Sequence, residues 1–261
     1  MVLWLFVGAL VMMSAVMAAG WLVQKRAEDS GWIDVFWTLG TGAAGVLSAF
    51  LFGEMPARAA VVGILVAVWS LRLGTHITLR VAKGPEDSRY GRLREEWRAR
   101  YQANIFWFMQ AQAPASAVLC LSIGLAAADP SPGPRLRDVA AVVIAAAAII
   151  GEGLADAQLE RFRRDPGNRR RINDRGLWAW SRHPNYFFEW LGWTAYPLIA
   201  LDPRRPTTWL SLAAPVLMFL VLTRLTGVPY MEEHMAKSRG QAWAAYARRT
   251  SAFFPLPPRR S

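Results

Sequence analysis

Residues 176–193 read GLWAWSRHPNYFFEWLGW, and this stretch leads from a polar loop into an apolar run. Pro184 suits the first turn of a helix, where a missing backbone N–H is tolerated. Asn185 and Glu189 follow four residues apart, so they share one face of that helix. A carboxylate at the mouth of a membrane helix is unfavourable and by default indicates function. The stretch therefore predicts a helix that places a functional site in a membrane.

The rest of the chain repeats this pattern of long apolar runs between short polar segments. Hydrophobic residues make up 54% of the 261 residues, and runs of about 20 apolar residues are typical of membrane-spanning helices. We count seven runs: residues 1–23, 32–52, 59–79, 105–128, 139–151, 186–201 and 207–223. The membrane span predicted from the fifth run is longer than the run itself, at about 138–160. The predicted fold class is an all-α polytopic membrane protein with about seven transmembrane helices, in which residues 1–261 form a single transmembrane domain.

The positive charges predict an orientation. With the N-terminus outside, the inner segments hold 23 of the 30 Lys and Arg residues. The outer loops hold only Arg58, Arg135, Arg137, Arg204 and Arg205. Because Lys and Arg concentrate in cytoplasmic loops, we expect the N-terminus outside and the C-terminus in the cytoplasm. This asymmetry accounts for the net charge of +11, so we expect membrane lipids as partners and no nucleic acid.

Polar side chains gather in the inner half of the predicted spans. They come from five helices: Asp34, Arg72, Arg80, Glu152, Asp156, Asn185, Glu189 and Arg224. Independent surface defects would not all fall in one leaflet, so we expect a water-filled cavity that opens to the cytoplasm. The alternative is a set of structural ion pairs, such as Glu189 with Arg72 or Arg224.

The loop after the third run carries further candidates. Gly84 and Pro85 predict a turn, and a closely spaced polar group follows, for which we favour a ligand-binding role: Glu86, Asp87, Arg89 and Tyr90. From 92 to 104, Arg and Glu recur at helical spacing, which predicts an amphipathic helix on the inner membrane face.

The mixture of charges in the expected cavity suits a dinucleotide. Arginines bind phosphates through bidentate contacts, carboxylates suit ribose hydroxyls, and an asparagine can hold a carboxamide. The sequence has no GxGxxG motif, which argues against a Rossmann domain. The lone Cys120 and three scattered His residues predict no disulfide within the chain and no metal site.

From Glu152 to the end, the sequence resembles the C-terminal half of the membrane steroid 5α-reductase family, in particular its bacterial, uncharacterised branch. The resemblance rests on GLWAWSRHPNYFFEW at 176–190 and on the stretch from Asp156 through Arg163 to Asp165–Pro166. The segment WSLRLGTHITLRVAKGPEDSRY at 69–90 fits the same branch. The resemblance implies a seven-helix reductase that uses NADPH on an activated C=C bond in a lipid or steroid-like enone. It also implies a multi-pass protein of the bacterial inner membrane.

The resemblance assigns roles to residues and places the cofactor-binding part mainly in 152–261. Asn185 and Glu189 match positions that hold nicotinamide and ribose, and Asp156, Arg163 and Arg224 match positions around the phosphates and adenosine. The complete predicted cofactor set is Arg72, Arg80, Glu86, Asp87, Arg89, Asp156, Arg163, Arg182, His183, Asn185, Tyr186, Glu189 and Arg224.

Asp34 and Tyr90 are the predicted catalytic pair. Asp34 falls where the reductases have a glutamate that meets the substrate carbonyl. We expect either Asp34, kept protonated in a low-dielectric setting, or Tyr90 to stabilise the charge that develops on that oxygen. Two departures, Ile33–Asp34 for a Gln-Glu pair and Trp69 for a tyrosine, make the substrate assignment weaker than the cofactor assignment.

Two other functions fit the same residues. Isoprenylcysteine-type membrane methyltransferases share part of RHPNY and have a C-terminal Glu-Glu followed by glycine and tyrosine, as in Glu232–Glu233, Gly240 and Tyr246. That resemblance implies S-adenosylmethionine as the alternative cofactor. The third possibility is a membrane protein that binds lipid or assists assembly without catalysis.

Overall fold

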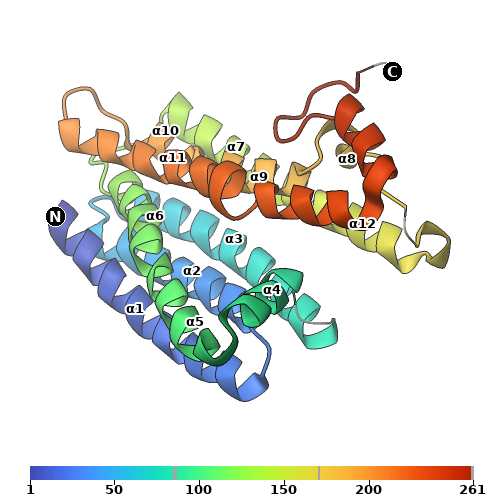
Figure 1. Ribbon diagram of the computed structural model, residues 1–261. Helices are drawn as coiled ribbons and strands as arrows, with labels where there is room; N and C mark the ends of the chain where they lie inside the picture. The colour runs from blue at the N-terminus through green and yellow to red at the C-terminus, as the bar shows by residue number, and fades with distance from the viewer. Residues whose placement is uncertain (85–86, 170, 260–261) are drawn as a thin grey trace. The chain divides into compact units, whose positions relative to one another are not determined.

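The computed structural model describes residues 1–84, 87–169 and 171–259, which contain helices and no strand. Three long helices match the first three apolar runs: α1 (Val2–Ala27), α2 (Trp32–Phe52) and α3 (Pro56–Lys83). The other α-helices are α4 (Ser88–Trp97), α5 (Tyr101–Gln110), α6 (Gln112–Ala127), α7 (Leu136–Arg164), α8 (Leu177–Trp180), α9 (Pro184–Trp193), α10 (Ala195–Ala200), α11 (Ala213–Leu220) and α12 (Val228–Arg249). Short turns named η1 (Arg98–Arg100), η2 (Pro166–Asn168), η3 (Pro206–Leu212) and η4 (Val221–Leu225) lie between them (Figure 1).

The chain is an all-α polytopic membrane protein. Six helical stretches of the described residues are long and apolar enough to cross a membrane: Val2–Ala27, Trp32–Phe52, Pro56–Lys83, Ser88–Ala127, Leu136–Arg164 and Pro206–Arg249. Large hydrophobic side chains such as Phe50, Leu51 and Ile64 lie exposed on these helices. A lipid environment accounts for them, because a water-exposed helix would bury such side chains.

The predicted span at 186–201 takes a different form. It consists of α9 and α10, which are 10 and 6 residues long and separated at Thr194. The Thr194 hydroxyl donates to the Leu191 carbonyl oxygen at 2.7 Å, within the last turn of α9. Because both helices are short, this segment is not among the six long stretches.

The predicted amphipathic helix at 92–104 begins earlier and ends earlier than expected. α4 starts at Ser88, after Asp87 caps its first turn, and ends at Trp97. Arg98 has a positive φ of 44°, which a helix cannot continue through. The chain then passes through η1 into α5.

The contacts within the chain define two compact units, each made of two segments. Unit 1 contains residues 1–141 and 196–214, and unit 2 contains residues 142–195 and 215–261. The single transmembrane domain expected from the sequence stays a prediction, and each unit is described by itself below.

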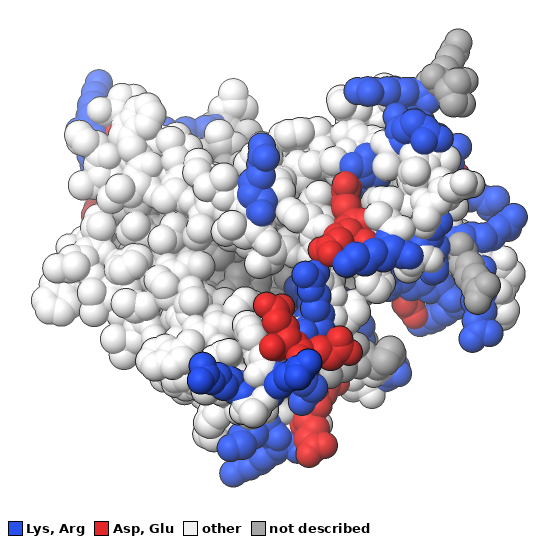
Figure 2. All heavy atoms as spheres, viewed as in Figure 1, with Lys and Arg blue, Asp and Glu red and all other residues white. Residues whose placement is uncertain are grey.

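In unit 1, α2 is the central helix and packs against α1, α3 and α6. Glycines permit this close packing. A Cβ on Gly40 would lie 2.6 Å from a methyl carbon of Val16 on α1, and one on Gly45 would lie 2.8 Å from Ile123 on α6. Figure 2 shows a largely uncharged surface over these helices, with charged side chains gathered near the α3–α4 end of unit 1.

In unit 2, aromatic side chains join the C-terminal segment to the helices. Phe253 packs edge-on against Phe187 and Trp190 of α9, with ring centroids 6.0 and 5.9 Å apart, and against Phe219 of α11 at 5.5 Å. The chain after α12 therefore folds back along this unit.

Candidate functional site

In unit 1, the predicted catalytic residues meet where α3 ends and α4 begins. The Tyr90 hydroxyl donates to Oδ1 of Asp34 at 2.9 Å. Arg89 donates from Nη2 to Oδ2 of the same carboxylate at 2.7 Å. Asp34 lies in the first turn of α2, so residues 55 and 56 positions apart in the sequence converge on one carboxylate.

Two further residues of the predicted cofactor set complete this cluster. Nη2 of Arg80 lies 3.7 Å from Asp34 and 3.6 Å from Asp87. Arg89 also donates from Nη2 to Asp87 at 3.0 Å. Two guanidinium groups therefore lie beside two carboxylates. We call Asp34, Arg80, Asp87, Arg89 and Tyr90 the Asp34 cluster.

Asp87 positions the cluster through the backbone. Its Oδ1 accepts a hydrogen bond from the backbone N–H of Arg89 at 3.0 Å, which caps α4. Burial acts to raise the pKa of Asp87, but the charge and hydrogen bonds of Arg89, with the charge of Arg80, outweigh it and lower the pKa. The carboxylate form is therefore the one that holds Arg89 in place.

The geometry distinguishes the two candidates for the acid. Asp34 accepts from a guanidinium and a phenol, and a second guanidinium lies nearby. Asp34 is thus the acceptor of this pair, and Tyr90, whose side chain is buried, is the donor. The expectation of a protonated Asp34 stays a prediction.

The remaining unit 1 candidates lie near this cluster in the sequence. Arg72 is on α3, about two turns before Arg80, and is partly buried. Glu86 lies outside the described residues. Cofactor contacts by the unit 1 residues stay a prediction.

In unit 2, the start of α9 brings together several predicted residues. Nδ2 of Asn185 donates to Oδ1 of Asp156 on α7 at 3.4 Å. Glu189, one turn further along α9, is only 7% exposed and accepts from Nε1 of Trp193 at 2.9 Å. The Tyr186 ring stacks on His183, with centroids 5.5 Å apart and planes inclined by 6°.

Arg182 and His183 contact a glutamate of α12. Nε and Nη2 of Arg182 lie 2.7 and 2.6 Å from Oε1 of Glu232, and Nε2 of His183 lies 3.4 Å from the same atom. Burial lowers the pKa of His183, and the hydrogen bond and charge of Glu232 oppose the shift without cancelling it. The neutral imidazole is therefore favoured.

Arg163 and Arg224 occupy exposed positions in unit 2. Arg163 lies in the last turn of α7, and Arg224 lies on the π-helical turn η4. Of the predicted cofactor residues in this unit, the structure thus joins Asp156 to Asn185 directly and buries Glu189, while these two arginines remain on the surface.

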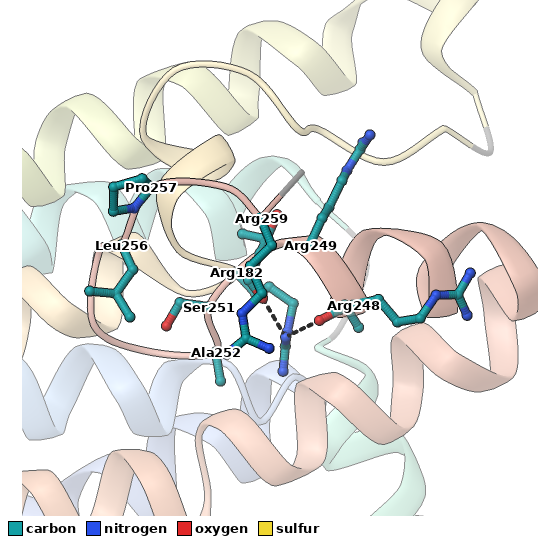
Figure 3. A pocket seen from close by; sticks show the side chains of 10 residues that line it. Arg182, Arg248, Arg249, Ser251, Ala252, Leu256, Pro257 and Arg259 are labelled. Atoms are coloured by element: carbon teal, nitrogen blue, oxygen red, sulfur yellow. Dashed lines mark hydrogen bonds between the residues drawn. The ribbon is translucent and has the colours of Figure 1, made fainter. Parts of the chain in front are cut away.

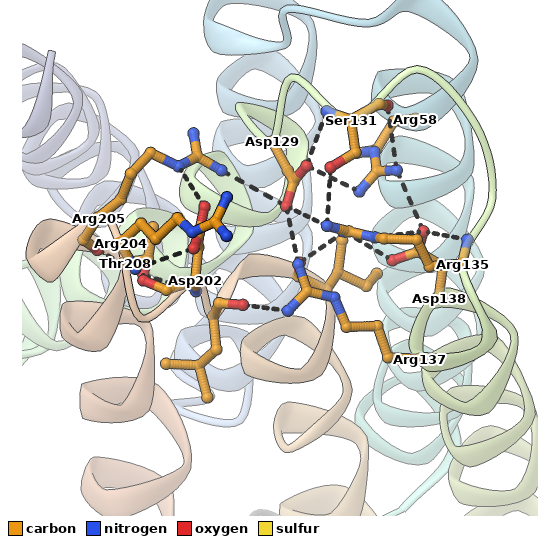
Figure 4. A network of polar contacts seen from close by, with 12 residues as sticks. Arg58, Asp129, Ser131, Arg135, Arg137, Asp138, Asp202, Arg204, Arg205 and Thr208 are labelled. Carbon is orange, nitrogen blue, oxygen red and sulfur yellow. Dashed lines mark hydrogen bonds and ion pairs between the residues drawn. The ribbon is translucent and has the colours of Figure 1, made fainter.

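The sequence reasoning missed a second polar network, on Asp129 of unit 1. The Asp129 side chain is fully buried. Figure 4 shows four guanidinium groups around it, at 2.8, 3.2, 3.4 and 3.5 Å: those of Arg135, Arg137, Arg58 and Arg205, respectively. Burial acts to raise the pKa of Asp129, but hydrogen bonds from Ser131 and Arg135 outweigh it and lower the pKa.

One signal in the sequence could have revealed this network. Its four arginines are among the five assigned to the outer side, where the charge bias of membrane proteins disfavours them. Arginines that lie against this bias need anionic partners, and the segment after the fourth run offers Asp129 and Asp138. In the structure Arg58 contacts both of these carboxylates.

Comparison with known proteins identifies the family. The model of a family described as "Protein of unknown function (DUF1295)" matches residues 20–250, so the chain belongs to this family. No curated protein and no solved structure matches the chain.

Proposed function

We propose that this member of the DUF1295 family is a membrane-embedded, NADPH-dependent reductase of an activated C=C bond in a lipid or steroid-like enone. The resemblance of residues 152–193 to membrane steroid 5α-reductases suggests the reaction. The observation that carries the proposal is the buried carboxylate of Glu189, one turn after an asparagine that contacts Asp156. Nε1 of Trp193 donates to one oxygen of this carboxylate, and a hydroxyl group of a bound cofactor would be a suitable further donor.

The residues of unit 2 fit the polar groups of NADPH. Asn185 offers both a donor and an acceptor, as a carboxamide requires. Glu189 and Asp156 suit hydroxyl groups, and Arg163 and Arg224 suit phosphates. When bound, NADPH supplies the hydride. The residues named here would bind and orient it, since hydride transfer depends on close and fixed geometry.

The Asp34 cluster suits the substrate oxygen. Tyr90 is the donor of this pair, and Asp34 accepts its hydrogen bond at 2.9 Å. We propose that Tyr90 redirects this hydrogen bond to a substrate carbonyl, where negative charge develops during reduction. Asp34, Arg89 and Arg80 would then act by holding Tyr90 in place.

The test is the effect of cofactor on thermal unfolding in detergent. NADPH at 100 times its Kd stabilises a native protein by about 2.7 kcal/mol, which raises its melting temperature. We expect this rise in the wild type, and a Kd at least tenfold weaker in Glu189→Gln and Asn185→Ala. The matched controls Glu160→Gln and Gln241→Ala replace an exposed glutamate and an exposed side-chain amide, and should bind as the wild type does. Absence of wild-type binding at millimolar NADPH would overturn the proposal.

One contact favours the methyltransferase alternative. Glu232, of the C-terminal Glu-Glu pair, meets Arg182 and His183 of the RHPNY stretch. Isoprenylcysteine-type enzymes have both motifs, so this pairing also suits an S-adenosylmethionine-dependent enzyme. The same unfolding experiment separates the two, because a methyltransferase would respond to S-adenosylmethionine and not to NADPH.

The proposed setting is the bacterial inner membrane, with the N-terminus outside. A lipid-like substrate would reach the protein from the bilayer and NADPH from the cytoplasm. The apolar surface of the spanning helices and the excess of Lys and Arg in the predicted inner segments support this arrangement.

A further inference from the structure

The chain after α12 is held against the start of the RHPNY stretch. We call residues 180–182 together with 250–259 the C-terminal clasp. The backbone N–H of Arg182 donates to Ser251 at 2.8 Å, and that of Leu256 donates to Trp180 at 3.0 Å. The Arg182 side chain adds Nη1 bonds to the carbonyl oxygens of Thr250 and Ala247, at 2.6 and 2.9 Å. The clasp is thus a fixed part of unit 2.

A cavity of about 260 Å³ opens at the clasp. Its ten lining residues include four arginines and two hydroxyl residues, and no acidic residue: Arg182, Arg248, Arg249, Arg259, Thr250 and Ser251. In Figure 3, the Arg259 side chain extends toward the Arg182 guanidinium, whereas Arg248 and Arg249 extend outward from the end of α12. The cavity therefore has basic walls and a basic rim.

Two of the four arginines that line the cavity form ion pairs with a carboxylate. Arg182 pairs with Glu232, and Arg249 pairs with Asp174. No ion pair within the described ranges involves Arg248 or Arg259, whose side chains are exposed. The Arg259 side chain thus lies at this cavity without a carboxylate from the described part of the chain, while the Arg248 side chain, also without one, extends outward from the rim.

We propose that this cavity binds a phosphate monoester group. The planar guanidinium fork matches phosphate oxygens bidentately, and the hydroxyls of Thr250 and Ser251 can donate to the remaining oxygens. The volume lies below the range of about 300–1,000 Å³ that accommodates whole drug-sized ligands. The site therefore suits the phosphate of a larger molecule, either a soluble compound or a lipid headgroup. The cavity shares Arg182 with the predicted cofactor set, but the proposal rests on the cavity lining and not on the reductase proposal, and neither of its probes contains a nucleotide.

Inorganic phosphate is the first probe, measured against chloride at equal ionic strength. We expect phosphate to raise the melting temperature of the wild type in detergent, and its Kd to weaken at least tenfold in the double variant Arg248→Gln/Arg259→Gln. Neither of these side chains makes a hydrogen bond or ion pair in the described structure, so folding should be preserved. The control Arg161→Gln/Arg169→Gln removes the same charge from exposed residues of unit 2 and should respond as the wild type does.

The second probe distinguishes the source of the phosphate. Native mass spectrometry counts phosphatidic acid bound to protein released from nanodiscs, with phosphatidylcholine, a diester, as the comparison. Retention of phosphatidic acid that depends on Arg248 and Arg259 supports the site with a lipid headgroup as its ligand. A response to inorganic phosphate alone supports a soluble monoester. Equal responses in the two double variants, or none to either probe in the wild type, would overturn the proposal.

Discussion

At the scale of single residues, Asp34 shows how one carboxylate can organise a site. It accepts hydrogen bonds from Arg89 and Tyr90 and lies 3.7 Å from Arg80. Removing its charge leaves the buried Tyr90 hydroxyl and the Arg89 guanidinium with a weaker acceptor. We expect Asp34→Asn to reduce the free energy of unfolding by about 1–3 kcal/mol, measured by denaturant titration in detergent micelles.

An exposed ion pair provides the comparison for Asp34. Glu160 accepts from Arg164 at 2.9 Å, and their side chains are 50% and 77% exposed. Because exposed helical pairs contribute only about 0.3–0.5 kcal/mol, Glu160→Gln should change the stability by no more than that. Equal losses in the two variants would show that the Asp34 contacts do not stabilise the protein.

His183 predicts a pH dependence. Burial lowers its pKa below the usual value of 6.5, with Glu232 opposing the shift and Arg182 adding to it. The unfolded chain therefore takes up a proton more readily than the native protein does. The stability is fully present above about pH 6.5 and falls as the pH drops from there toward the native-state pKa.

The measurement is the free energy of unfolding between pH 5 and 8. We expect the loss of stability on acidification to be smaller in His183→Gln, which has no imidazole to protonate. His234→Gln, at an exposed position on α12, is the matched control and should keep the wild-type slope. A slope that is the same in His183→Gln and the wild type would exclude His183 as its source.

Contacts between residues far apart in the sequence were the hardest to predict at this scale. Asp156 and Asn185 were both expected to line one polar cavity, and Nδ2 of Asn185 lies 3.4 Å from Oδ1 of Asp156, while the cavity itself stays a prediction. The partner of Arg182, by contrast, is Glu232, 50 residues later. That pairing depends on how α12 folds back, which no local spacing encodes.

At the scale of elements, the apolar runs located the helices well and their interruptions poorly. The runs at 1–23, 32–52 and 59–79 correspond to α1, α2 and α3. The run at 186–201 breaks into α9 and α10 at Thr194. Hydropathy indicates how many consecutive residues are apolar enough to lie in the membrane. A break in the helix within such a segment depends on hydrogen bonds and packing, which hydropathy does not measure.

One side chain, that of Arg182, makes several of the contacts that hold the clasp. Arg182 donates to the carbonyl oxygens of Thr250, in the C-terminal segment, and of Ala247, in α12, and to Glu232 of α12. Hydrogen bonds to a charged group contribute about 1.5–3 kcal/mol each. We expect Arg182→Gln to open the clasp locally and to raise amide hydrogen exchange of Leu256 and Arg259 at least tenfold.

Hydrogen exchange followed by mass spectrometry tests this opening. The amides of Leu256 and Arg259 bond to the carbonyls of Trp180 and Arg249, so they report the clasp directly. Arg161→Gln, in the same unit but outside the clasp, should leave them protected. Unchanged protection in Arg182→Gln would mean that the aromatic packing of Phe253 holds the segment without Arg182.

At the scale of the whole molecule, the Asp129 network bears on the orientation. Four of the five arginines predicted for the outer side surround its buried carboxylate. Pairing satisfies part of their charge within the folded protein. The ion pairs with Asp129 therefore explain why these arginines lie on the side where Lys and Arg are disfavoured. The excess of Lys and Arg in the inner segments can still determine the topology.

The orientation is testable because the chain has one cysteine. Cys120 is fully buried on α6, so the wild type should give little background with a membrane-impermeant maleimide. Gly133→Cys places a thiol on the exposed loop between α6 and α7, where a Cβ meets nothing within 4 Å, and Arg169→Cys places one in the exposed segment after α7. With the N-terminus outside, we expect intact cells to label Gly133→Cys, and Arg169→Cys to react only after the cells are permeabilised. The reverse pattern would place the excess of Lys and Arg outside. It would also remove the cytoplasmic access on which NADPH binding by Asn185 and Glu189 depends.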